Sequence, residues 1–267
     1  MRPLRRARLL ALLLVLGSLL TCLGAHATAA GQSAVPDWSE RLGRAARNAA
    51  LAPRTWVPLL GAVALQAGEA DRRLQSWAAE QTPLFGSRRN ADRISDDLKL
   101  LANSAWVISA VVPWQDEDAG LMGSKARVLG VQVVGHMATS GLVARLKDDT
   151  ARLRPNGEGA TSFPSDHASR AALHTAYTRF NITHLGWSDV AQARASVGLD
   201  VLSAGTAWAR IEAHQHYPSD VLAGMALGNF IGTFVTQAFL NRREAQGLQV
   251  MLQPTRDRFL LTLQMPF

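Results

Sequence analysis

Three short motifs that contain charged residues and histidines follow one another along the chain. They are Lys147-(six residues)-Arg154-Pro155, Pro164-Ser165-Asp166-His167 and Arg210-(five residues)-His216-(three residues)-Asp220. A phosphoryl group in transfer spreads its charge over three oxygens, so catalysis depends on positioning and on charge stabilisation. Arginine binds phosphate through two parallel hydrogen bonds, and lysine adds a point charge. These residue types therefore suit the binding and transfer of a phosphoryl group without a metal.

The middle motif predicts the start of a helix that attracts an anion. Ser165 follows a proline and precedes an apolar run that begins at Ala168, which is typical of a helix N-cap. The first backbone amides of such a helix are free to bind an anion. Asp166 in the first turn fits the same helix dipole, and it is counted with the phosphate-binding positions.

The two motif histidines supply the pair of groups that an in-line displacement needs: one attacks phosphorus and the other protonates the leaving oxygen. Pro218, at a first helical position, places Asp220 in the first turn of the next helix. From there Asp220 is expected to reach one ring nitrogen of His216 and to leave the other free to attack. His167 lies outside this pairing and is the better candidate for the acid.

The order and spacing of these motifs resemble the signature of the type 2 phosphatidic acid phosphatase superfamily. That superfamily also contains bacterial class A acid phosphatases and vanadium haloperoxidases. The resemblance is strongest over residues 147–224, and the run from Tyr217 to Gly224 looks most like the bacterial lipid phosphatase branch. It implies the same roles that the chemistry suggests. His216 would be the nucleophile, Asp220 its orienting group, His167 the acid, and Lys147, Arg154, Ser165 and Arg210 the phosphate ligands.

Two positions depart from the usual pattern of the superfamily. Asp166 stands where most members have glycine, although aspartate also occurs in members that resemble undecaprenyl-diphosphate phosphatases. Ala209 stands where many members have a serine, which removes a hydroxyl that would bond to phosphate. The short stretch between Pro155 and Pro164 argues for an open site rather than one covered by a deep lid.

The sequence thus predicts a metal-independent phosphatase that needs no cofactor and acts through a phosphohistidine. Its expected partner is a phosphorylated substrate, a lipid phosphate or diphosphate by resemblance, at or near a membrane surface. The alternatives are a soluble non-specific acid phosphatase, a vanadate-dependent haloperoxidase, an inactive phosphate-binding module, and a metal hydrolase that uses His214 and His216. The other histidines, His136, His174 and His184, are given no role.

Residues 1–29 have the features of a secretory signal, with four arginines followed by an apolar stretch from Leu9 to Leu23. Its removal would lower the formal charge from +7 to +3, so nucleic-acid binding loses its main support. It would also remove Cys22, the only cysteine. We expect an exported protein, periplasmic or extracellular, with a single phosphatase domain over residues 30–267. The oligomeric state is not predicted.

Apolar periodicity and Gly/Pro punctuation predict an all-α helical bundle whose motif helices line one end. The uncharged segment Val221–Leu240 is long enough to cross a bilayer, but Gly224, Gly228 and Gly232 form a stripe that suits close helix packing. We interpret it as the core helix of a soluble bundle, and a membrane-embedded phosphatase is the alternative. The predicted helices cover residues 38–50, 54–68, 70–80, 91–113, 121–146, 166–181, 188–214 and 218–241.

The hydrophobic period changes near the C-terminus. Within residues 247–267, apolar residues alternate with polar ones in two runs that are separated by Pro254–Asp257. This alternation predicts a β-hairpin packed on the bundle.

Overall fold

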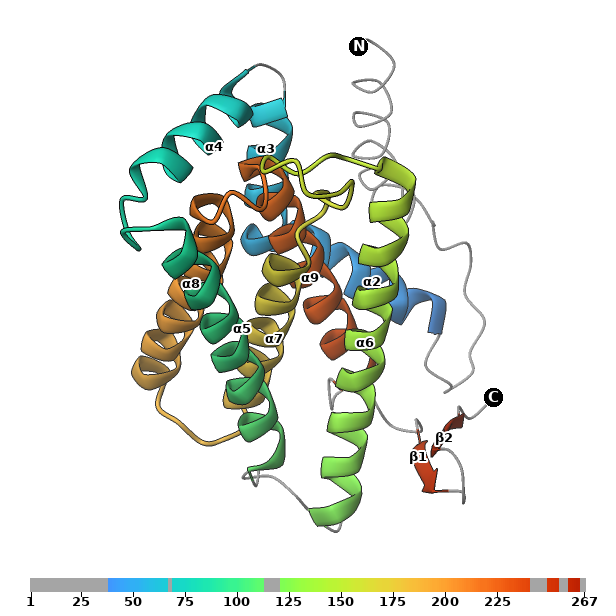
Figure 1. Ribbon diagram of the computed structural model, residues 1–267. Coiled ribbons are helices and arrows are strands. Elements are labelled where there is room, and N and C mark those ends of the chain that lie inside the picture. Colours follow the sequence, from blue (N-terminus) through green and yellow to red (C-terminus); the bar gives the residue numbers. More distant parts are fainter. Residues whose placement is uncertain (1–37, 67–68, 113–120, 241–248, 255–258, 265–267) are drawn as a thin grey trace.

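The computed structural model describes residues 38–66, 69–112, 121–240, 249–254 and 259–264. The all-α prediction is confirmed (Figure 1), while the predicted secretory signal lies outside the described residues. The helices are α2 (Trp38–Leu51), α3 (Pro53–Gln66), α4 (Ala70–Gln81), α5 (Arg88–Val111), α6 (Leu121–Thr150), α7 (Asp166–Ile182), α8 (Asp189–Glu212) and α9 (Pro218–Phe239).

Serine caps fix the start of three helices. Ser87, Ser165 and Ser188 each accept a hydrogen bond from the backbone amide three residues on, which satisfies a donor that the helix leaves unpaired. The cap at Ser87 explains why α5 begins at Arg88, three residues before the predicted start. The predicted cap at Ser165 is confirmed, so the middle motif does open a helix.

Helix α9 lies at the centre of the bundle and contacts α2, α3, α6, α7 and α8 (Figure 1). Among the described residues it is the one helix long and apolar enough to cross a membrane, yet 67% of its most apolar window is buried inside the protein. Burial of this kind agrees with the prediction of a core helix.

The glycine stripe of α9 brings its backbone against that of α7. A Cβ atom at Gly228 would lie 2.1 Å from the carbonyl oxygen of Ser169, and one at Gly224 would lie 2.6 Å from that of Ser165. No side chain fits into these gaps. The stripe therefore fixes α7, and the motif at its start, directly against α9.

We expect Gly228→Ala to destabilise the protein, at the upper end of the about 1–3 kcal/mol that overpacking costs, because the new methyl group meets backbone atoms that cannot move aside. Gly198→Ala is the matched control. Gly198 lies in α8 with nothing within 4 Å of the added Cβ, and there alanine should stabilise by about 0.5–1 kcal/mol. Urea unfolding of both variants checks the pair, and equal changes in the free energy of unfolding would contradict the close contact.

The predicted C-terminal hairpin is confirmed. Strands β1 (Gln249–Pro254) and β2 (Phe259–Gln264) pair antiparallel, with Gln249 opposite Gln264, and β1 lies beside α6. The hairpin is thus on the far side of α6 from α5 and α7, and it contributes nothing to the motif end of the bundle (Figure 1).

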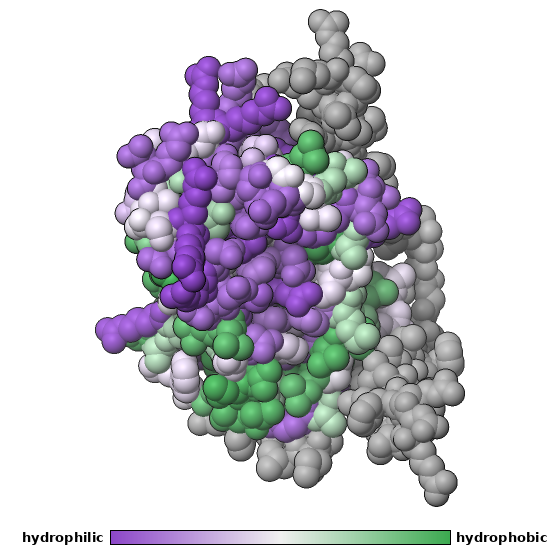
Figure 2. All heavy atoms as spheres, viewed as in Figure 1, coloured by the Kyte–Doolittle hydropathy of each residue, from purple (hydrophilic) through white to green (hydrophobic). Residues whose placement is uncertain are grey.

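Polar and apolar residues are segregated along the bundle (Figure 2). The end that carries the motifs is hydrophilic, and apolar side chains gather lower down, over α5 and α6. Large exposed apolar residues of these two helices are Leu100, Leu101, Val107, Ile108, Val111, Val133, Val134, Met137 and Leu142. Large exposed apolar patches are typical of surfaces at which proteins meet a partner or a lipid phase.

Candidate active site

The fold brings all three motifs to one end of the bundle. Lys147 lies in the last turn of α6, Arg210 in the last turn of α8, and His167 in the first turn of α7. His216 lies in the turn between α8 and α9, and Asp220 is in the first turn of α9. Residues far apart in the sequence therefore meet where two helices end and two begin.

Three cations surround the ring of His216, whose residue is only 1% exposed. Burial lowers the pKa of His216 well below its usual value, and the charges of Arg210, Lys147 and Arg154 lower it further. The imidazole is consequently neutral at neutral pH, with an unprotonated nitrogen available for attack. A cluster of three cations around a neutral imidazole is a site for an anion.

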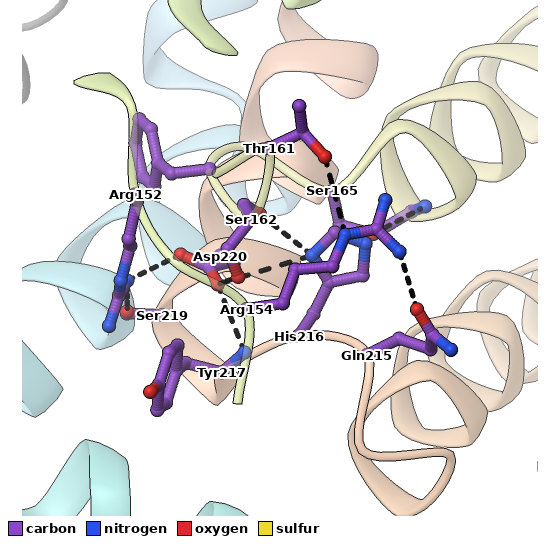
Figure 3. A network of polar contacts seen from close by, with 12 residues as sticks. Arg152, Arg154, Thr161, Ser162, Ser165, Gln215, His216, Tyr217, Ser219 and Asp220 are labelled. Atoms are coloured by element: carbon purple, nitrogen blue, oxygen red, sulfur yellow. Dashed lines mark hydrogen bonds and ion pairs between the residues drawn. The ribbon is translucent and has the colours of Figure 1, made fainter. Parts of the chain in front are cut away.

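The ring of His216 is oriented differently from the sequence prediction. Its Nδ1 lies 2.7 Å from the carbonyl oxygen of Ser162, whereas the nearer carboxylate oxygen of Asp220 is 4.0 Å away (Figure 3). The prediction that Asp220 bonds directly to the ring is therefore wrong in this state. Among the described residues, Nε2 makes no hydrogen bond, so this nitrogen keeps its lone pair for attack.

Asp220 is held back from the ring by other partners. Its carboxylate accepts hydrogen bonds from the hydroxyl of Ser162, from the guanidinium of Arg152 and from the backbone amide of Tyr217 at 3.0 Å. The last contact caps α9, as expected for an acidic residue at the third position. Burial raises the pKa of Asp220 to about 6, although Arg152 acts in the opposite direction.

The three cations near His216 have partners within the protein. Nη1 of Arg210 lies 2.6 Å from Oδ1 of Asp92 and 3.0 Å from Oγ of Ser95, both on α5. Lys147 donates to the carbonyl oxygen of Thr161 at 3.0 Å, and Arg154 to the side chain of Gln215. A bound phosphate would have to exchange with these contacts.

His167 also contacts α5, which the pattern of the motifs does not predict. Its Nε2 lies 2.8 Å from Oδ1 of Asp96 and 2.9 Å from Nζ of Lys99. Burial lowers the pKa of His167 to about 4, the charge of Arg210 acts in the same direction, and Asp96 opposes both. A negatively charged phosphoryl group beside the ring would raise this pKa again and so favour the protonated form that an acid needs.

The remaining motif positions have structural partners. Ser165 donates its backbone amide to the carbonyl oxygen of Asp220 at 3.0 Å and caps α7 with its hydroxyl. The carboxylate of Asp166 pairs with Arg170 at 3.0 Å. A carboxylate can only accept hydrogen bonds, so the backbone amide is the group of Asp166 that could donate to an anion. His214 has φ of 60° and bonds through Nδ1 to Gln75 at 2.6 Å, with its ring directed to α4 rather than to a site shared with His216.

Comparison with known proteins gives three matches. The model of the PAP2 superfamily matches residues 129–244. The lipid A 1-phosphatase of Porphyromonas gingivalis is 34% identical over 104 residues, which are 39% of this chain and 21% of that protein. The chain thus spans about a fifth of the length of this relative.

A solved structure also resembles the chain. It is a transmembrane PAP2-type phosphatidylglycerolphosphate phosphatase from Bacillus subtilis, with 20% identity and a TM-score of 0.49. The match covers 68% of this chain and 92% of that chain. The superfamily match contains all three motifs, whose residues lie around His216, so residues 129–244 of the chain are similar to the PAP2 superfamily.

Proposed function

We propose that this protein is a phosphatase that removes a phosphoryl group from a lipid phosphate or lipid diphosphate through a phosphohistidine on His216. The observation that carries the proposal is the neutral, buried imidazole of His216 within a cluster of three cations. The superfamily match supports a phosphatase. The relative named lipid A 1-phosphatase supports a lipid as the substrate.

In the first step, the phosphoryl group binds between Lys147, Arg154 and Arg210 at the amino end of α7. Nε2 of His216 attacks phosphorus while the bond from phosphorus to the leaving oxygen breaks. Protonated His167 transfers its proton to that oxygen. The carbonyl of Ser162 holds the Nδ1 proton of His216 and stabilises the positive charge of the phosphorylated ring.

In the second step, His167, now neutral, takes a proton from a water molecule that attacks the phosphohistidine. The bond between phosphorus and Nε2 breaks, phosphate leaves, and His216 is neutral again. His167 thus ends protonated, as it began, and no metal is needed to balance either step.

The exposed apolar residues of α5 and α6 support a lipid surface as the place where substrate is met. Trp106, a candidate for such contact from its residue type, is buried at 6% exposure and stacks on His174 instead. The aliphatic residues of the two helices take this role. We place the site outside the cytoplasm, because the expected signal at residues 1–29 would export the chain.

A substrate panel with EDTA tests the proposal on the purified full chain. It contains a lipid phosphate and a lipid diphosphate in vesicles, the same compounds in detergent, and a soluble phosphate ester. We expect phosphate release that survives EDTA and is fastest for a lipid in vesicles. Loss of activity with EDTA and recovery with a divalent metal would support the metal hydrolase, and equal turnover of the soluble ester would support a non-specific acid phosphatase.

The same panel separates the two non-hydrolytic alternatives. Phosphate binding without release would identify an inactive binding module. Halide oxidation by peroxide that depends on added vanadate would identify a haloperoxidase.

A further inference from the structure

Arg152 lies next to the site, although it belongs to none of the motifs. It is in the segment that joins α6 and α7, it is 5% exposed, and its guanidinium lies 4.2 Å from the ring centre of Tyr217. Its Nη1 donates to Oδ1 of Asp220 and, at 2.8 Å, to the hydroxyl of Ser219 (Figure 3). Its Nη2 lies 2.6 Å from Oδ2 of Asp71. Two buried carboxylates therefore share one guanidinium.

Asp71 links this arrangement to α4, a helix without any motif residue. It is 4% exposed, and its carboxylate accepts from the backbone amide of Ser219 at 2.8 Å and from the hydroxyl of Ser219 at 2.7 Å. It thus binds the first turn of α9, one residue before Asp220. Both carboxylate oxygens of Asp71 are thus engaged: Oδ1 by the backbone of Ser219, and Oδ2 by Arg152 and the hydroxyl of Ser219.

We propose that Arg152 and Asp71 are positioning residues that set the orientation and the charge of Asp220, and through it the readiness of His216 to attack. The inference rests on the proposed function, since it assigns a task within the same reaction. The chain of contacts is continuous: Asp71 to Arg152, Arg152 to Asp220, and Asp220 through the hydroxyl of Ser162 to the residue whose carbonyl holds Nδ1 of His216.

The two residues act on Asp220 in opposite directions. The positive charge of Arg152 lowers the pKa of this carboxyl group, and the negative charge of Asp71 raises it, against a background of burial that brings it to about 6. The hydroxyl of Ser162 and the amide of Tyr217 also favour the ionised form. Lys147 also interacts with the charge of Asp220, and it stays in place in the variants below.

The test is the acid limb of the pH profile of kcat/KM, measured on one substrate so that the ionisation of the substrate contributes equally throughout. Arg152→Met should move the limb upward by about one pH unit or more, because Asp220 then holds its proton to higher pH. Asp71→Asn, which keeps the shape and the acceptor oxygen, should move it downward. If the two residues served only for packing, both variants would be less stable, but the acid limbs of their pH profiles would not shift in opposite directions.

Two further variants complete the experiment. Arg152→Lys keeps the charge but cannot bridge two carboxylates, so the limb should stay in place while kcat falls about tenfold or more. Asp200→Asn removes a carboxylate that pairs with Arg54 and Arg179 on the surface, remote from the site, and should leave the profile unchanged.

If circular dichroism shows that Arg152→Met does not fold, the shift of the acid limb in Asp71→Asn is the test of the proposal. A downward shift supports the proposal, and an unmoved limb in a folded, active Asp71→Asn variant overturns it. Failure of the proposed function is distinguishable, because the unmodified chain would then form no phosphoenzyme at any pH.

Discussion

Replacing His216 with alanine is expected to abolish the phosphoenzyme and to reduce turnover by at least about a thousandfold, because the variant has no nucleophile. The measurement is acid and alkaline quenching of the enzyme with labelled substrate, since a phosphohistidine is labile to acid and stable to base. Asp220→Asn should retain measurable phosphoenzyme, because the carbonyl of Ser162 still orients the ring.

His214→Asn is the matched control for removing a histidine two residues away. Asparagine tolerates the left-handed backbone at this position, where φ is 60°. The variant should keep its phosphoenzyme and most of its turnover. A normal phosphoenzyme in the His216→Ala variant would disprove the mechanism, and loss of EDTA-resistant activity in His214→Asn would indicate that the two histidines act together.

His167→Ala is expected to slow substrates with poor leaving groups by about 10²–10⁴-fold and to leave activated aryl phosphates much less affected. An alkoxide needs a proton as it leaves, whereas an aryl oxide leaves without one. The measurement is the dependence of kcat/KM on the pKa of the leaving group, which should be steep in the variant and shallow in the unmodified protein. Equal losses on both kinds of substrate would show that His167 only binds phosphate.

Most of the fold was predictable because its signals are local. Ser165 and Pro218 mark helix starts by their residue types, and the described helices lie within a few residues of the predicted ranges. The glycine stripe correctly indicated that α9 packs closely on another helix. Motif spacing was enough to predict that Lys147 and Arg210 meet at one end of the bundle.

The immediate neighbours of the motif side chains were not predictable, because they depend on the path of a loop. The group that holds Nδ1 of His216 is a backbone carbonyl, which every residue carries, so Ser162 has no sequence signal for this role. Arg152 is one of many arginines, and only its burial between Asp71 and Asp220 distinguishes it. A polar stripe at helical spacing on α5 was visible at Asp92, Ser95, Asp96 and Lys99, yet such a stripe is usually a solvated face.

The backbone contact between α7 and α9 has a consequence for the precision of the site. Packed helices usually lie 8–10 Å apart, at a distance that the side chains between them set. At Gly224 and Gly228 no side chain intervenes, so van der Waals contact between the two backbones sets the separation, and rotamer changes in the core cannot alter it. His167 and Asp220 lie on the first turns of these two helices. His167 and Asp220 are therefore held at a separation that the backbones of α7 and α9 fix, and a change of side-chain volume elsewhere in the core leaves this separation in place.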